Sequence, residues 1–156
     1  MADNDVVLRA PHVLEYPYVR SVGPVIGGFL TGLRDGKILG AQSRAADGTP
    51  TVVVPPTEYD PFTGADVGEL VEVGQAGVVT TWAWTDAPRP DQPLDRPFAW
   101  ALVRLDGADT AMLHAVDAGV AEAMATGMRV SVRWRSAAER VGSMLDIECF
   151  VPEGMP

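Results

Sequence analysis

Five segments of alternating apolar and polar residues in the second half of the chain constrain its fold most strongly. They are AGVVTTWAWTD, PFAWALVRLDG, TAMLHAV, MRVSVRWR and LDIECFVP, all between residues 76 and 152. A period of two is typical of strands that bury one face. A short helical segment, residues 119–127, lies between the third strand and the fourth. This order predicts a five-stranded OB-fold barrel.

Two elements are expected before the barrel. Residues 1–20 carry Pro11 and Pro17 and are predicted to form an extended arm, in which Tyr16 and Tyr18 are available as anchors. Residues 21–36 are predicted to form a helix with Ser21 as its N-cap and Gly36 at its end. The apolar residues of this helix share one face: Val25, Ile26, Phe29, Leu30 and Leu33.

Glycines in the predicted helix point to close packing. Gly23, Gly27, Gly28 and Gly32 each cost about 1 kcal/mol relative to alanine in a helix interior. They form two pairs spaced four residues apart, which leaves bare stripes where another backbone can approach. The neighbour is either the chain's own sheet or a second protein, and the sequence leaves both interpretations open.

The chain is expected to be mainly β and to have three parts. Residues 1–36 form the arm and helix, residues 37–74 form a small module with short β segments at 38–42 and 49–55, and residues 75–156 form the OB-fold domain.

Composition argues against several classes of protein. The 156 residues hold 12 Lys and Arg against 21 Asp and Glu, a formal net charge of −9. Binding that neutralises many phosphates along a polynucleotide is therefore not expected. A single cysteine forms no internal disulfide, and a reducing cytoplasmic location is expected. No apolar run is long enough to span a bilayer, and the N-terminal sequence MADNDVVLRA is acidic where a signal peptide is basic.

The fourth barrel strand carries the one concentrated positive stripe of the sequence. Arg129, Arg133 and Arg135 alternate with apolar residues and are predicted to share one face. Guanidinium groups match phosphate oxygens, so this stripe is a candidate site for the phosphates of a nucleotide-containing ligand. The alternative is a solvated strand face paired with neighbouring carboxylates such as Asp146 and Glu148.

Tryptophans of the first barrel strand have two interpretations. Trp82 and Trp84 share one face, and Trp100 lies on the next strand. Aromatic side chains on a barrel face stack on bases or an adenine ring, but they also serve as core residues or as anchors for a protein partner.

Catalytic residues are sparse. His114 and Cys149 each alternate with apolar residues and are expected to be packed inside the barrel. No Ser-His-Asp arrangement, phosphate loop or dinucleotide fingerprint is present. The sequence therefore argues against an independent enzyme.

The order of these segments resembles a known family. The helix segment GFLTGLRDGKILGAQ, a small module, and then GQAGVVTTWAW and RPFAWALVRLDG are similar to the acyl-CoA-associated OB-fold family, domain of unknown function 35 (DUF35). The resemblance covers residues 21–151 and implies an N-terminal helix, a rubredoxin-like zinc ribbon and an OB barrel. Many members are accessory subunits of thiolase-like enzymes that act on CoA thioesters.

At the zinc ligands the chain departs from the family pattern. Where the resemblance implies two pairs of cysteines, Arg44 and Asp47 stand at the first pair and Asp60 and Thr63 at the second. Zinc prefers Cys and His in closed tetrahedral sites, so a degenerate ribbon without metal is expected. An ion pair of Arg44 with Asp47 or Asp60 is the candidate cross-link in its place.

The resemblance implies a non-catalytic accessory subunit in a hetero-oligomer with a thiolase-like partner, a sterol-carrier-type thiolase or an aldolase, in lipid or steroid degradation. It would stabilise the partner and help to form its acyl-CoA channel, with no cofactor, nucleic acid or membrane. The predicted partner contacts are Gly28, Phe29, Gly32, Trp82 and Trp84, and the candidates for CoA phosphates are Arg129, Arg133 and Arg135.

Two other functions remain as alternatives. One is an OB module that binds single-stranded nucleic acid through the tryptophans and the arginine stripe, and the other is a small enzyme that uses His114.

Overall fold

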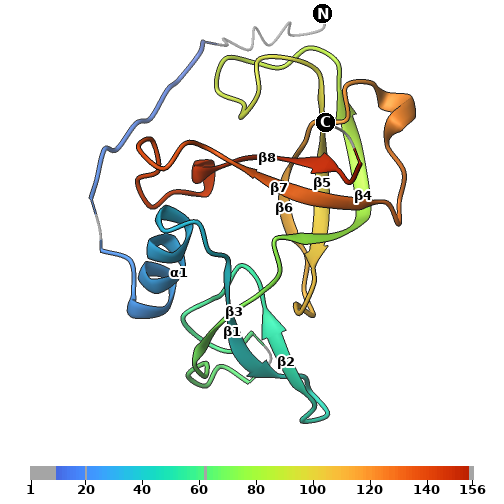
Figure 1. Ribbon diagram of the computed structural model, residues 1–156. Coiled ribbons are helices and arrows are strands. Elements are labelled where there is room, and N and C mark those ends of the chain that lie inside the picture. The colour runs from blue at the N-terminus through green and yellow to red at the C-terminus, as the bar shows by residue number, and fades with distance from the viewer. Residues whose placement is uncertain (1–9, 20, 62, 155–156) are drawn as a thin grey trace, which may run out of the picture.

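The computed structural model describes residues 10–19, 21–61 and 63–154. Its elements are α1 (Pro24–Arg34), β1 (Leu39–Arg44), β2 (Pro50–Val53), β3 (Leu70–Glu72), β4 (Ala76–Thr85), β5 (Phe98–Leu105), β6 (Met112–Val116), the 3-10 helix η1 (Ala121–Ala123), β7 (Arg129–Trp134), the 3-10 helix η2 (Met144–Asp146) and β8 (Ile147–Pro152). The predicted mainly β fold with an N-terminal helix is confirmed (Figure 1). Within the described ranges, no helix has the length and hydropathy needed to cross a bilayer.

Strands β4 to β8 close into a barrel with the order β4–β5–β6–β8–β7. β6 and β8 are parallel, paired at Val116 and Phe150, and the other neighbours are antiparallel. This arrangement confirms the predicted OB-fold. The predicted helix at 119–127 is wrong, because only the single turn η1 forms there. Val120 and Met124 on either side of η1 are extended, and the side chain of Met124 is buried in the core.

Helix α1 begins two residues later than predicted. Its N-cap is Gly23, not Ser21, and glycine has no side chain that could bond to the first turn. Glu58 of the small module supplies the missing acceptor: Ile26 N donates to its Oε1 at 2.8 Å and Val25 N to its Oε2 at 3.4 Å. A Cβ on Gly23 would overlap this carboxylate, so the glycine makes room for a cap that comes from a distant segment.

The end of α1 agrees with the prediction. Gly36 has a φ of 76°, and its N–H donates to Leu33 O at 3.0 Å, while Lys37 N donates to Gly32 O at 2.8 Å. This pair of bonds is the Schellman pattern, which needs a left-handed residue at the helix end and so favours glycine.

Before the barrel, a three-stranded antiparallel sheet has the order β2–β1–β3. Two residues of the loop between β5 and β6, Asp109 and Thr110, form a clip that hydrogen-bonds to the edge strand β2 and to Val54 just after it. Asp109 N donates to Val52 O at 2.9 Å, and Val52 N donates to Asp109 Oδ2 at 2.7 Å. Thr110 Oγ1 accepts from Val54 N at 2.7 Å and donates to Val54 O at 2.9 Å. The loop thereby satisfies backbone groups that a bare edge would expose.

One hydrophobic cluster runs from the helix through the small sheet into the barrel. Its members from outside the barrel are Phe29, Leu33, Ile38, Val54 and Val73, and its barrel members include Val79, Ala101, Val103, Met112, Val130 and Phe150. The helix and small sheet therefore share a core with the barrel.

The N-terminal arm lies apart from this core. Residues 10–19 are exposed and contain no helix or strand, as the prediction of an extended arm requires. The rest of the predicted arm, residues 1–9 and 20, lies outside the described residues.

Candidate functional site

The positions where the family resemblance implies zinc ligands lie in two similar turns. In the first turn, Ala45 N donates to Thr49 O and Gly48 N donates to Ala45 O, each at 2.8 Å. In the second turn, Asp60 N donates to Ala65 O at 2.7 Å and Gly64 N to Asp60 O at 2.9 Å. Each turn carries a glycine of positive φ, at positions 48 and 64.

The carboxylate of Asp60 joins the two turns. It is 6% exposed, and it accepts hydrogen bonds from Ser43 Oγ and, at 3.3 Å, from Arg44 N of the first turn. Within its own turn it accepts from Thr63 N at 2.7 Å. A hydrogen bond to a charged group is stronger than one between neutral groups, so this carboxylate is an effective cross-link between the turns.

These positions do not fit a zinc ion. Arg44 brings a cation, and the oxygens of Asp60 already accept backbone and hydroxyl donors. No group of three or more His, Cys, Asp or Glu suited to a metal ion occurs in the described part of the chain.

The observed contacts of Arg44 differ from the predicted ion pair. Its guanidinium donates to Gly48 O at 3.0 Å, and Asp60 accepts a hydrogen bond from the backbone N–H of Arg44 at 3.3 Å. Asp47 accepts from Thr49 N at 2.9 Å. A pocket of about 510 Å³ beside the two turns is lined mainly by polar and charged side chains, among them Ser43, Arg44, Asp60, Asp66 and Asp109.

On the outer face of β7, two of the three arginines are engaged with carboxylates. Arg129 makes a bidentate contact with Asp106, at 2.6 and 2.7 Å, and also pairs with Glu153 at 3.1 Å. Arg133 pairs with Asp117 at 2.9 Å and with Glu148 at 3.3 Å. The alternative of a strand face paired with neighbouring carboxylates is therefore observed, with Glu148 as one predicted partner.

Asp146, the other predicted partner of the arginines, has a different role. It is buried and accepts hydrogen bonds from three successive backbone N–H groups, those of Val141, Gly142 and Ser143. Burial acts to raise the pKa of this carboxyl, but the backbone donors outweigh it and the pKa is lowered. Asp146 thus shapes the loop before β8.

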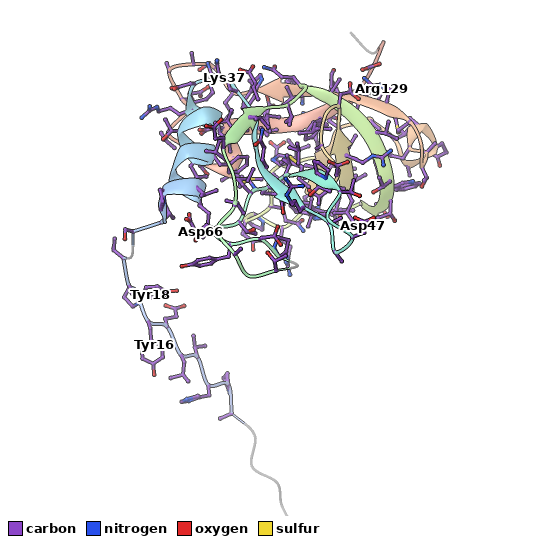
Figure 2. The ribbon with its side chains drawn as sticks, turned by 90° about the horizontal axis from the view of Figure 1, so that it is seen from below. Tyr16, Tyr18, Lys37, Asp47, Asp66 and Arg129 are labelled. Atoms are coloured by element: carbon purple, nitrogen blue, oxygen red, sulfur yellow. The ribbon has the colours of Figure 1, made fainter. Side chains whose placement is uncertain are left out.

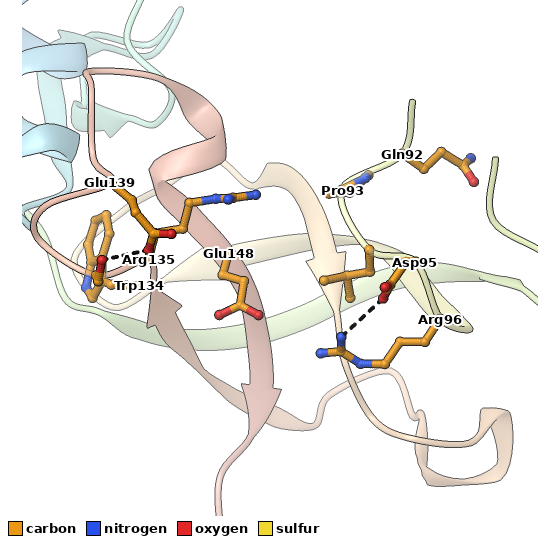
Figure 3. A pocket seen from close by; sticks show the side chains of 10 residues that line it. Gln92, Pro93, Asp95, Arg96, Trp134, Arg135, Glu139 and Glu148 are labelled. Atoms are coloured by element: carbon orange, nitrogen blue, oxygen red, sulfur yellow. Dashed lines mark hydrogen bonds and ion pairs between the residues drawn. The ribbon is translucent and has the colours of Figure 1, made fainter. Parts of the chain in front are cut away.

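Arg135 is the member of the stripe that lines a pocket. This pocket of about 430 Å³ lies between the loop before β5 and the end of β7 (Figure 3). Arg135 Nε donates to Leu145 O at 2.6 Å. A second arginine, Arg96, lines the same pocket and pairs with Asp117 at 2.6 Å. The acidic residues Asp95, Glu139 and Glu148 also face this space.

Trp82 and Trp84 lie on the inward side of β4. They pair in register with Ala101 and Ala99, whose small side chains are buried, and they are half-buried against the core. The Nε1 of Trp84 donates to Asp86 at 2.8 Å. This placement favours the interpretation of these residues as part of the core.

The stripe of Gly28 and Gly32 faces the chain's own sheet, whereas a Cβ on Gly23 would meet Glu58 and one on Gly27 would meet, among the described residues, only Val22 within 4 Å. A Cβ on Gly28 would lie 2.5 Å from Leu70 Cδ1, and one on Gly32 would lie 2.9 Å from Leu39 Cγ. Phe29 is 3% exposed. Of the two interpretations, packing within the chain is the one the geometry favours.

His114 and Cys149 are buried, as expected. His114 Nε2 lies 3.2 Å from Met144 O, and its Nδ1 has no hydrogen-bond partner among the described residues. Burial lowers the pKa of His114 and raises the pKa of Cys149 to about 11. Both side chains are therefore neutral near pH 7.

Three contributions to these sites were missed in the sequence: Arg96 at the pocket, Glu58 at the helix and the Asp109–Thr110 clip. Glu58 and the clip each act on a segment more than 30 residues away, so no local pattern signals them.

A known family model matches part of the barrel. Residues 70–135 match the family model for the ChsH2 C-terminal OB-fold domain. The matched region begins at β3 and ends one residue after β7. A search of curated proteins found no significant match.

Two solved structures are similar over more of the chain. A chain of the Ltp2-ChsH2(DUF35) aldolase matches with a TM-score of 0.57 and 21% identity, over 86% of this chain and 98% of that chain. A protein of unknown function from the DUF35 family of Sulfolobus solfataricus matches with a TM-score of 0.54 and 21% identity, over 71% of this chain and 77% of that chain. At this identity the likenesses show a shared fold. Together with the family model, they confirm the resemblance of this chain to the DUF35 OB-fold family.

Proposed function

We propose that this chain is an accessory subunit that pairs with a thiolase-like catalytic subunit. The observation that carries the proposal is the likeness to the Ltp2-ChsH2(DUF35) aldolase, which covers 98% of the aldolase chain and 86% of this one. The OB-fold domain alone makes up about half of this chain, so the likeness includes elements that precede the barrel.

The chain's own residues support a non-catalytic role. A nucleophile needs an adjacent base and an orienting group, and His114 and Cys149 are buried without such neighbours. The chemistry would then belong to the partner. We assign the complex to acyl-CoA metabolism in lipid or steroid degradation, with this chain stabilising the partner and helping to form the acyl-CoA channel.

Arg135 is the candidate for the CoA phosphates, because it lines the pocket and its Nε donates to a backbone carbonyl, whereas Arg96 in the same pocket already pairs with Asp117 at 2.6 Å. Arg129 and Arg133 are less suited, since carboxylates already surround their guanidinium groups. Bidentate recognition of a phosphate requires N–H groups that have no stronger partner.

Co-expression with the thiolase-like protein of the same genome tests the proposal. We expect a stable complex on size exclusion with light scattering, with two copies of this chain on a catalytic dimer. The complex should convert an acyl-CoA thioester into a shorter acyl-CoA, and this chain alone should leave the thioester unchanged. Absence of a complex would refute the proposal, and turnover by this chain alone would refute its non-catalytic role.

A variant pair tests the CoA assignment within the active complex. Arg135→Ala should raise the KM for acyl-CoA with little change in kcat, because a ground-state contact is removed. Arg89→Ala is the matched control, since Arg89 is exposed and pairs only loosely with Asp91 at 3.7 Å. An unchanged KM in the Arg135 variant would move the CoA site elsewhere.

Two observations weigh against the nucleic-acid alternative. Its proposed stacking residues, Trp82 and Trp84, pack against the barrel core, and two of its three arginines are ion-paired.

A further inference from the structure

The N-terminal arm concentrates exposed apolar surface in a segment that stands away from the body. Five large apolar side chains of residues 10–19 have exposed fractions between 65% and 102%: Val13, Leu14, Tyr16, Tyr18 and Val19. Figure 2 shows the arm leaving the domain, with Tyr16 and Tyr18 along it. Contiguous exposed apolar surface of this kind marks interaction sites in soluble proteins.

These side chains have an order suited to one-sided contact. Leu14, Tyr16 and Tyr18 alternate, so in an extended chain they project from the same side. Pro17 lacks a backbone N–H and fixes its own φ, which disfavours a helix and limits the arm to the edge of a sheet or to a groove. An extended segment with fewer accessible conformations loses less entropy on binding.

The arm leads into a helix whose first turn is fixed. Pro24 and the carboxylate of Glu58 hold this turn of α1. Tyr59, next to that cap, is itself 62% exposed. A partner that holds the arm would therefore also approach the start of α1.

A surface on a second protein fits the arm better than the pocket between the loop before β5 and the end of β7. That pocket is lined mainly by charged and polar side chains, which do not match a face made of one leucine and two tyrosines. The likeness to the Ltp2-ChsH2(DUF35) aldolase, named for two proteins, favours the catalytic subunit as the partner. A matching surface would be an apolar groove with hydrogen-bonding groups for two phenol hydroxyls.

We propose that residues 10–19 bind in extended form to an apolar groove on the catalytic subunit, with Leu14, Tyr16 and Tyr18 as the anchors. This inference rests on the proposed function. Tyrosines are among the residues that carry most of the energy of a protein interface. The arm would then act as a strap that supplements the contact made by the folded body.

Paired variants of the full chain test the proposal. Tyr16→Ala with Tyr18→Ala removes the anchor side, and Val13→Ala with Val19→Ala removes apolar surface from the opposite side of the same arm. All four positions are exposed, so neither pair should change the Tm of the chain. We expect the tyrosine pair to weaken the Kd for the catalytic subunit at least tenfold and the valine pair to change it less than threefold.

Proteolysis gives a second readout. Chymotrypsin should cleave the chain alone after Tyr18, because exposed segments are cut readily, and the bond after Tyr16 should resist because proline follows it. The complex should protect the Tyr18 site.

Each other outcome overturns a distinct statement. If the full chain binds but the tyrosine variant binds equally well and the Tyr18 site is still cut, the arm is not an anchor and the proposed function stands. Equal losses from both pairs would overturn the one-sided contact. An arm-dependent dimer of this chain alone would identify a second copy as the occupant, and failure of the full chain to bind would overturn the proposed function as well.

Discussion

The buried carboxylate of Asp60 joins the two turns of the small sheet. It accepts donors from both turns, and its bonds reach the backbone of Arg44 and Thr63. Removal would leave those N–H groups without their acceptor.

We predict that Asp60→Ala lowers the free energy of unfolding by about 2–4 kcal/mol, since charged hydrogen bonds contribute about 1.5–3 kcal/mol each. Urea denaturation measures the change. Asp47→Ala is the control, because Asp47 is exposed and accepts one bond, from Thr49 N. If both variants lost the same stability, Asp60 would not be the cross-link.

His114 predicts a pH dependence of stability. Burial lowers its pKa in the folded chain, so the folded state binds the proton more weakly than the unfolded state does. Stability is therefore fully present above the unfolded value of about 6.5 and falls as the pH drops below it, by at most about 1.4 kcal/mol per pH unit.

Thermal unfolding between pH 7.5 and 5 checks this expectation. His114→Leu should be flatter over that interval, because the side chain no longer titrates. A slope equal to that of the original chain would assign the dependence to other groups.

At the scale of elements, helix α1 owes its first turn to a distant side chain. The Glu58 carboxylate accepts the N–H groups of Val25 and Ile26, and Gly23 leaves room for it. A side-chain cap of this kind contributes about 0.5–2 kcal/mol.

Glu58→Ala should lower stability by about 1 kcal/mol and speed amide exchange at Val25 and Ile26. Hydrogen exchange followed by NMR measures both sites. Glu69→Ala, an exposed carboxylate in the same module, serves as the control. Unchanged exchange at these two amides would show that the cap does not stabilise the helix.

The elements differ in how far the sequence predicts them. Strands β4 to β8 follow from the period of two, because each buries one face. The segment at 119–127 is rich in alanine and predicts a helix, but burial of Met124 and the connection to β7 leave only η1. The cap on α1 is invisible in the sequence, since Ile26 and Glu58 are 32 residues apart.

At the scale of the whole molecule, the barrel and the small sheet are joined by a shared core and by the clip at Asp109 and Thr110. The residues at positions 44, 47, 60 and 63 could be read from the sequence. The hydrogen bonds from Ser43 and Arg44 to Asp60 could not, because they depend on how the two turns approach each other.

Thr110→Val should remove both bonds to Val54 and lower stability by about 1–3 kcal/mol, because two buried backbone groups lose their partner. Circular dichroism and tryptophan fluorescence during denaturation test whether the sheet and barrel still unfold together. Thr80→Val, which removes one exposed bond to Leu102 O, is the control. Equal losses of stability in the two variants would mean that the clip does not stabilise the contact between the small sheet and the barrel.

A cross-link made from Asp60 is encoded entirely in the chain, so it is complete as soon as the two turns fold. Ribbons held by thiolates depend on metal delivery during synthesis and are undone by oxidants that attack sulfur. This chain should reach its native state regardless of the zinc supply of the cell, and treatment with a chelator or with hydrogen peroxide should leave its small sheet intact. We therefore expect its maturation to be independent of metal homeostasis.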